Sequence, residues 1–446
     1  MKKRSPAPRG KPSGQGPAEA VPATVAIEAM GAQGHGIARI GGERIFVPFT
    51  LPGERVRVEL RGARADAVAI EAPSPDRIEP LCKHFGACGG CALQHWSEER
   101  YTEWKTGLVT QALAQAGIEA ATGPLKSYPD SSRRRAAFTA RYTGGKIELG
   151  YNAQRSHDLI DLEECPVLLP AIAQALPPLR VALAAAMPAR SEAKVYVGAA
   201  ENGLDCAVQG PSLRAAAHAG LLQALAGAGF IRATWNEELV LLAAVPFVSC
   251  GGVKVTLPAG AFLQAVEACE HDMANWVLDA LSEAKPALGP ICDLFAGLGA
   301  FSFPAARLAP VTAFEENPGA VAALGAAAKR AKGLKPVVAI RRDLYRNPLG
   351  PMELNKFACI IMDPPREGAE AQARALAASK AATVAMLSCN PATFARDAAI
   401  LIAGGFQLSR LAVFDQFKFS PHVEIAALFL RADGAARRRS PSFTSL

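Results

Sequence analysis

The sequence predicts an α/β protein in which a small β barrel and a mixed α+β segment precede a doubly wound, mostly parallel sheet. From about residue 286 onward, strand-like runs alternate with Ala-rich helical runs. This alternation is the pattern of a parallel sheet covered by helices on both faces. Residues 21–72 instead carry short β-like runs between Gly-rich turns, which is typical of a small antiparallel barrel.

Changes of pattern and the linker-like "PSPDR" divide the chain into five predicted segments. They are a disordered basic arm (1–20), an OB-like barrel (21–75), a mixed α+β central domain (76–258), the doubly wound domain (259–432) and a disordered tail (433–446).

The composition indicates a globular protein that suits a polyanionic partner. Of the 446 residues, 50% are hydrophobic and 20% are charged, which is enough apolar material for two or three domains. The net charge of +7 suits nucleic acid, although many enzymes without such a partner have a similar charge. We find no apolar run of about 18 residues and no signal-like N-terminus. We therefore expect a cytoplasmic protein that does not span a membrane.

Three cysteines lie close together in "CKHFGACGGCALQH", which covers residues 82–95. They are Cys82, Cys88 and Cys91, and a fourth candidate, Cys165, follows far downstream. Disulfides are not expected in a chain without a secretion signal. Four thiolates suit either zinc or an iron–sulfur cluster, and the spacing alone does not decide between them.

The doubly wound segment begins with a glycine-containing turn between a strand and a helix, "DLFAGLGAF". Gly297 and Gly299 allow the backbone to approach a ligand at the helix N-terminus. Glu315 ends the next strand, about 20 residues after Asp293, where a carboxylate can bind ribose hydroxyls. Asp343 follows the third strand, where it can meet an adenine amino group. The turn resembles the first motif of S-adenosylmethionine-dependent methyltransferases more than the dinucleotide-binding motif of dehydrogenases.

Reactive side chains follow the next strands. Asp363 precedes two prolines in "DPP", Cys389 lies in "SCNP", and Glu424 begins the last strand. Carbon C5 of uracil becomes nucleophilic when a thiolate adds to C6, and a base must then remove the C5 proton. Cys389 and Glu424 can perform these two steps. Two alternatives remain: an amino-N-methyltransferase, which needs no cysteine, and a non-catalytic RNA-binding scaffold with a vestigial methyltransferase fold.

Together these motifs resemble the RNA (uracil-5-)-methyltransferases, specifically the iron–sulfur members that act on 23S ribosomal RNA. The resemblance covers residues from about 20 to 430 and includes "YPDSSRRRAAF" and "SHDLIDLEECPVL". It implies a Rossmann-like class I methyltransferase domain and an N-terminal TRAM domain. The roles that it implies are a [4Fe–4S] cluster on Cys82, Cys88, Cys91 and Cys165, S-adenosylmethionine binding by Gln264, Phe295, Glu315, Asp343 and Asp363, a nucleophile at Cys389 and a base at Glu424.

The implied partner is RNA, with 23S ribosomal RNA favoured over transfer RNA. The target uridine must leave its stack, so we expect a single-stranded or loop region as substrate. The basic run of Arg133, Arg134 and Arg135 is predicted to contact phosphates, and we expect a monomer. The chain departs from the family at Ala300, where Asn is common, and at Val266, so these two donor contacts are expected to differ.

Overall fold

The computed structural model describes residues 21–431 apart from 62–63, 155, 214–217 and 285–288. The tails predicted at 1–20 and 433–446 lie outside these residues. The chain forms two compact units. Of the described residues, the first unit comprises those from 21 up to Glu79 together with His95–Ser97, and the second comprises Pro80–Gln94 together with those from Glu98 to 431.

The first unit is a six-stranded β module in the order β1-β5-β6-β4-β3-β2. Its strands are β1 (Val21–Ala26), β2 (Ala29–Met30), β3 (His35–Ile40), β4 (Glu43–Pro48), β5 (Arg55–Arg61) and β6 (Arg64–Ala72). In β5, Val56 and Val58 are fully buried while Arg57 between them is exposed. This alternation directs one face of the strand to the core, and the N-terminal β module predicted from the sequence is confirmed.

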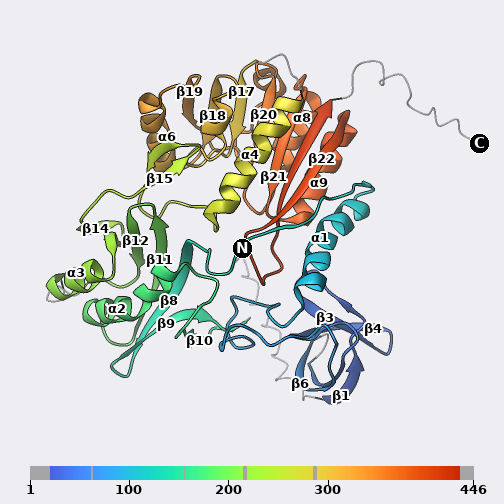
Figure 1. Ribbon diagram of the computed structural model, residues 1–446, viewed down its shortest axis with the longest axis vertical. Helices are drawn as coiled ribbons and strands as arrows, with labels where there is room; N and C mark the ends of the chain where they lie inside the picture. Colours follow the sequence, from blue (N-terminus) through green and yellow to red (C-terminus); the bar gives the residue numbers. More distant parts are fainter. Residues whose placement is uncertain (1–20, 62–63, 155, 214–217, 285–288, 432–446) are drawn as a thin grey trace, which may run out of the picture. The chain divides into compact units, whose positions relative to one another are not determined.

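The first helix of the second unit is α1 (Glu98–Gln115), and the unit contains two large sheets (Figure 1). The central sheet has the order β10-β9-β8-β11-β12-β13-β14, and helices α2 and α3 pack on its core. Its elements are β8 (Arg135–Thr143), β9 (Lys146–Asn152), β10 (Leu159–Asp161), α2 (Pro170–Ala186), β11 (Ser191–Ala200), β12 (Gly203–Gln209), α3 (His218–Gly227), β13 (Phe230–Trp235) and β14 (Glu238–Leu242). A hairpin of β15 (Phe247–Cys250) and β16 (Val253–Thr256) leads to the second sheet.

The second sheet has the order β19-β18-β17-β20-β21-β23-β22-β7. Strands β17 to β21 are parallel, and β23 runs antiparallel to both of its neighbours. The strands are β7 (Lys126–Ser127), β17 (Ile291–Leu294), β18 (Val311–Glu315), β19 (Val337–Arg341), β20 (Cys359–Met362), β21 (Thr383–Ser388), β22 (Phe406–Asp415) and β23 (Glu424–Arg431). The helices are α4 (Glu267–Glu283), α5 (Ser302–Ala305), α6 (Pro318–Arg330), α7 (Pro351–Leu354), α8 (Glu370–Ala378) and α9 (Pro391–Ala403).

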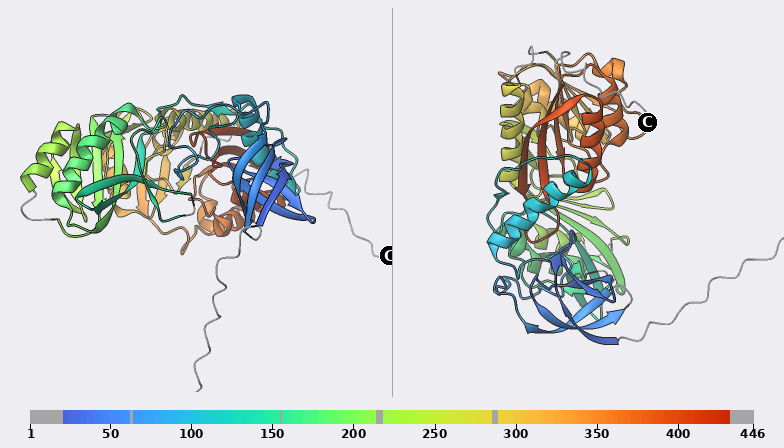
Figure 2. Two further views of the ribbon diagram at one scale, coloured as in Figure 1. Left: turned by 90° about the horizontal axis from the view of Figure 1, so that it is seen from below. Right: turned by 90° about the vertical axis from the view of Figure 1, so that its right-hand side faces the viewer.

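Helices cover both faces of this sheet, as Figure 2 shows. On β20, Ile360 and Met362 pack with residues of α1, α8 and α9, whereas Cys359 and Ile361 pack with residues of α4 and α5. Strands β20 and β21 are buried along their whole length, which explains why such central strands are almost continuously apolar, as in other helix-covered parallel sheets. The predicted doubly wound sheet is thereby confirmed. Within the described residues, no helix combines the length and apolarity needed to cross a bilayer.

The topology brings the predicted reactive groups to one edge. Parallel strands place the loops that follow them at the same edge of a sheet. Because β23 is antiparallel to β21, with Ser388 opposite Ile425, the start of β23 lies beside the end of β21. Cys389 and Glu424 therefore meet at this edge although they lie on different elements.

Candidate active site

The loop after β17 is shaped by residues with left-handed backbone conformations. Phe295 has φ of 64° and Gly299 has φ of 91°. A Cβ at Gly299 would lie 2.8 Å from the ring of Phe303, so a side chain at this position would clash with the core. The loop backbone donates from Gly297 N to Oε2 of Glu315 at 2.9 Å. Glu315 thus joins the ends of β17 and β18.

Two aromatic rings and a carboxylate lie in the loops that follow β17 and β19. The rings of Phe295 and Tyr345 lie 5.5 Å apart. Asp343 accepts hydrogen bonds from the backbone N–H groups of Tyr345 and Arg346, both at 3.0 Å, and so fixes the turn that presents Tyr345. Aromatic faces beside two carboxylates suit a nucleoside. Tyr345 was not identified from the sequence, where it follows Asp343 and Leu344 without a recognisable motif.

Asp293 is a further buried acid at this edge, and no role was predicted for it from the sequence. Its carboxylate is fully buried and accepts a hydrogen bond from Ser302. Its Oδ1 has no hydrogen-bond partner among the described residues. Burial raises the pKa of Asp293 to about 7, and Asp363 and Glu315 add to this rise. An unpartnered buried oxygen beside the loop provides an acceptor for a polar group of a ligand.

Cys389 lies half-buried between β21 and α9. The next residue, Asn390, caps α9 by accepting from Ala392 N at 3.1 Å and donates to the carbonyl of Arg366 at 3.1 Å. This contact joins the Cys389 loop to the "DPPREG" loop. Burial, with the carboxyls of Glu424 and Asp363 nearby, raises the pKa of the Cys389 thiol to about 12.

Two carboxyls lie near this thiol. Glu424 is 4% exposed. Burial and the charge of Asp363 raise its pKa to about 8, against the opposing effects of Gln416, Arg135 and Lys105. Burial and Glu270 raise the pKa of Asp363 to about 7. Carboxyls that titrate near neutral pH can exchange protons during a reaction.

A chain of hydrogen bonds connects the two carboxyls. Gln264 Nε2 donates to Asp363 Oδ2 at 3.4 Å, and Gln416 Nε2 donates both to Gln264 Oε1 and to Glu424 Oε1 at 2.7 Å. Sequence reasoning found Gln264 but missed Gln416. The available signal was its position, since Gln416 directly follows a strand that ends at the reactive edge.

The arginines of the basic run 133–135 do not share one environment. Arg134 is 3% exposed, and its guanidinium donates to the carbonyl of Gln264 at 3.0 Å and to Glu270 at 2.8 Å. It supports the loop that carries Gln264, so the expectation that all three arginines contact phosphates is wrong for Arg134. Arg135 stacks over the exposed ring of Phe262 at 4.3 Å. Its charge lies close enough to lower the pKa of Glu424.

The comparisons with known proteins agree with this arrangement. Residues 253–432 match the family described as tRNA (Uracil-5-)-methyltransferase, and residues 24–70 match the TRAM domain of tRNA (uracil(54)-C(5))-methyltransferase. A 23S rRNA (uracil(1939)-C(5))-methyltransferase of Halomonas elongata is 34% identical over 93% of this chain and 91% of its own length. An uncharacterised RNA methyltransferase of Caulobacter vibrioides is 44% identical over 91% of this chain and 99% of its own.

The chain belongs to the RNA uracil-C5 methyltransferases. These enzymes use S-adenosylmethionine. A solved structure supports the fold: Pyrococcus abyssi tRNA (uracil-54, C5)-methyltransferase in complex with S-adenosyl-L-homocysteine. It superimposes with a TM-score of 0.70 at 19% identity, covering 92% of this chain and 100% of that one. The doubly wound domain of this RNA uracil-C5 methyltransferase is thus a class I methyltransferase fold, and its first unit is a TRAM domain.

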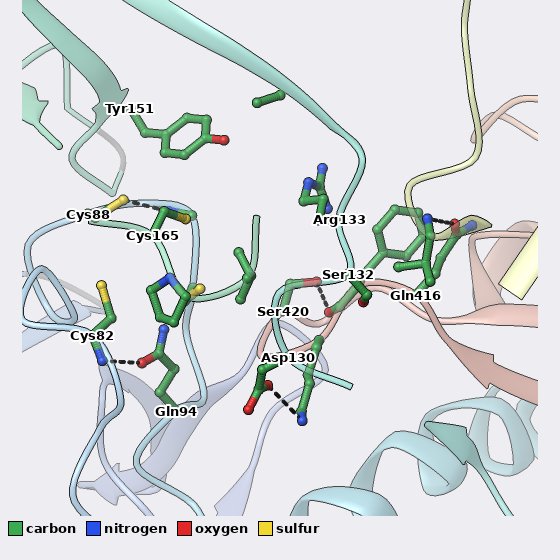
Figure 3. A pocket seen from close by; sticks show the side chains of 18 of the residues that line it. Cys82, Cys88, Gln94, Asp130, Ser132, Arg133, Tyr151, Cys165, Gln416 and Ser420 are labelled. Carbon is green, nitrogen blue, oxygen red and sulfur yellow. Dashed lines mark hydrogen bonds and ion pairs between the residues drawn. The ribbon is translucent and has the colours of Figure 1, made fainter. Parts of the chain in front are cut away.

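Four cysteines of this RNA uracil-C5 methyltransferase line one cavity of about 360 Å³ (Figure 3). They are Cys82, Cys88, Cys91 and Cys165, all with free thiols. Burial raises the pKa of Cys91 to about 12 and that of Cys165 to about 11. Across the described ranges, no group of three His, Cys, Asp or Glu side chains is close enough to hold a metal ion.

Backbone N–H groups face the sulfur atoms of this cavity. Gly90 N donates to Cys88 Sγ at 3.4 Å. Burial raises the pKa of Cys82 and of Cys165, and backbone N–H groups that face their sulfur atoms partly oppose this rise. Such donors stabilise thiolates and are a common feature of iron–sulfur sites. Four cysteine thiols on one cavity are the kind of donor set that a [4Fe–4S] cluster takes.

Proposed function

We propose that this enzyme methylates C5 of a uridine in 23S ribosomal RNA, with Cys389 as nucleophile and Glu424 as base. The observation that carries the proposal is the meeting of Cys389, Asp363 and Glu424 at one sheet edge, where Asp363 raises the pKa of both other groups and Glu424 raises that of Cys389. A thiol is needed for chemistry at C5 and is superfluous for methylation of an exocyclic amine. The name of the Halomonas relative supports ribosomal RNA as the substrate.

The nucleophile begins as a thiol, because burial raises its pKa to about 12. Its proton must pass to solvent before or as Sγ bonds to C6 of the uracil, so that Glu424 stays ionised for the later step, and the positive charge of Arg366 favours the thiolate. Formation of the Sγ–C6 bond moves the electron pair of the C5=C6 double bond into an enolate. C5 then becomes the carbon that accepts the methyl group.

The base acts after methylation. Glu424 takes the proton from C5, the C5–H electron pair restores the C5=C6 bond, and the Sγ–C6 bond breaks to release a thiolate. A carboxyl with a pKa of about 8 holds the accepted proton more firmly than an exposed glutamate, which favours its removal from C5.

The methyl donor fits the loops at the other end of the edge. S-adenosylmethionine, when bound, supplies the methyl group on a sulfonium sulfur. We propose that Phe295 and Glu315 contact its nucleoside, together with Asp343, and that Gln264 and Asp363 lie nearer the transferred methyl group. The unpartnered Oδ1 of Asp293 supports a polar ligand group at the same place.

We further propose that Cys82, Cys88, Cys91 and Cys165 hold a [4Fe–4S] cluster with an architectural role. The support is their shared cavity and the N–H groups that face the sulfurs. The cluster takes part in no step of the methylation proposed above.

Trapping with 5-fluorouridine tests the chemistry. Fluorine at C5 cannot be removed as a proton, so we expect an SDS-stable complex of the enzyme with 5-fluorouridine-containing RNA when the donor is present. Cys389→Ser should abolish the complex, whereas Cys206→Ala, in the central core, should retain it. Failure of the unmodified enzyme to form the complex would contradict the proposed mechanism.

Mapping of 5-methyluridine in a deletion strain tests the substrate. Loss of the modification from one site in 23S ribosomal RNA supports the proposal. Loss from transfer RNA alone would instead support the second candidate, which the descriptions of the matched family and of the Pyrococcus protein favour.

A further inference from the structure

The buried side-chain amide of Gln416 lies between Glu424, the proposed base, and the loop that carries Gln264. It is 2% exposed and directly follows β22. Its Oε1 accepts from Ala265 N at 2.8 Å and from Val266 N at 3.3 Å. Its Nε2 donates to Gln264 and to Glu424. All the hydrogen-bonding capacity of the amide is therefore used.

The orientation of this amide is fixed by its backbone partners. The N–H groups of Ala265 and Val266 can only donate, so they require the oxygen of Gln416 to face them. A rotated amide would place its own N–H groups against two donors in a buried site, which is strongly unfavourable. The two N–H groups of Gln416 must then face the other way, toward Gln264 and Glu424.

We propose that Gln416 is a positioning residue that holds the carboxyl of Glu424 in place and aligns it with Gln264. The base and the loop that carries Gln264, which is proposed to bind S-adenosylmethionine, are thereby placed together. The inference rests on the role proposed above for Glu424. Gln416 does not touch the reacting atoms in this scheme. It fixes which oxygen of Glu424 remains unengaged and available for the C5 proton, because Oε1 is engaged by Gln416.

Loss of this contact should affect one step in particular. Addition of Cys389 to C6 and methyl transfer do not require Glu424, whereas removal of the C5 proton does. A displaced Glu424 therefore leaves the methylated pyrimidine bonded to Sγ for longer. The covalent enzyme–RNA adduct should accumulate even with ordinary uridine in the RNA.

The test is Gln416→Met, which keeps the length of the side chain and removes its polar atoms. We expect kcat to fall about 10- to 100-fold, as for other small misplacements of catalytic groups. The Michaelis constant for RNA should change little. With unmodified RNA and S-adenosylmethionine, the fraction of enzyme in an SDS-stable adduct should rise severalfold.

Gln372→Met is the matched control. Gln372, on helix α8, is also a buried glutamine and is 1% exposed. Its amide hydrogen-bonds to both the N–H and the carbonyl of Leu349. It should destabilise the fold by a comparable amount without accumulating adduct.

Two results would overturn the inference: unchanged turnover in Gln416→Met, or slower turnover without accumulated adduct. These results differ from failure of the proposed function, which would appear as absence of the 5-fluorouridine complex in the unmodified enzyme. A folded Gln416→Met protein is verified by its thermal unfolding. If it does not fold, Gln416→Asn, which keeps the amide on a shorter side chain, replaces it under the same expectations.

Discussion

The distribution of protons among three neighbouring side chains governs the chemistry at the scale of single residues. Cys389, Asp363 and Glu424 all have raised pKa values because burial disfavours their charged forms. Each negative charge also disfavours the next, so at neutral pH the site holds fewer charges than its composition suggests. The charge on Glu424 and the ionisation of Cys389 are thus linked, because a protonated Glu424 makes it easier for the thiol to ionise.

This coupling predicts a pH-dependent final step. Glu424 accepts a proton only when ionised, and its pKa is raised to about 8. The decay rate of the methylated adduct should therefore rise about tenfold per pH unit below pH 8 and level off above it. Rapid-quench measurements of adduct decay from pH 5.5 to pH 9.5 would determine this profile.

The control for the profile is Glu424→Gln, in which the adduct should persist at every pH. A decay rate in the unmodified enzyme that does not change between pH 6 and pH 8 would contradict Glu424 as the base.

At the scale of elements, helix α1 supports the loop 416–423 that leads from β22 to Glu424. Lys105 Nζ and Tyr101 Oη of this helix each lie 2.6 Å from the carboxylate of Asp415. Lys105 also donates to the carbonyls of Phe417 and His422. The side chains of Lys105 and Asp415 are 0% and 1% exposed. This buried pair fixes both ends of the loop.

A double-mutant cycle should reveal this buried pair. Lys105→Met leaves the Asp415 carboxylate buried without its cation, and we expect a loss of about 3–5 kcal/mol in the free energy of unfolding. Combining it with Asp415→Leu should restore much of this loss, because no unpaired charge remains. Urea denaturation of the two single variants and the double variant measures these free energies of unfolding. A loss in the double variant equal to the sum of the two single losses would contradict the pairing.

The sequence predicts elements better than it predicts such contacts. The apolar strands, the glycine turn and the "DPP" and "SCNP" loops were predictable because period, proline and glycine are local signals. Lys105 and Asp415 are 310 positions apart, so no local pattern indicates their pairing. Arg134 was misassigned for a similar reason, since its buried partners, Gln264 and Glu270, lie far along the chain. Gln416 belongs to the same class.

At the scale of the second unit as a whole, the cysteine cavity and the loop before Glu424 are physically connected. The carbonyl of Phe419 accepts from Ala92 N at 2.8 Å and from Leu93 N at 3.1 Å. The segment that follows Cys91 is therefore hydrogen-bonded to the loop 416–423. Cys165 reaches the same cavity from the end of the central sheet. The proposed cluster would thus join two distant segments of the chain, 82–91 and that of Cys165, beside the loop that precedes the base.

Removal of one ligand tests this connection. Cys165→Ser should lower iron and acid-labile sulfide from about four of each per chain, the content of a [4Fe–4S] cluster. Because the loop 416–423 loses support, its amides should exchange hydrogen faster, while those of β17 and β18 stay protected. Cys250→Ser, buried in the hairpin core, is the matched control and should leave iron content and exchange unchanged. Zinc at about one per chain in the unmodified protein would contradict the cluster, and unaltered loop exchange in iron-free Cys165→Ser would show that the loop is supported by the α1 pair alone.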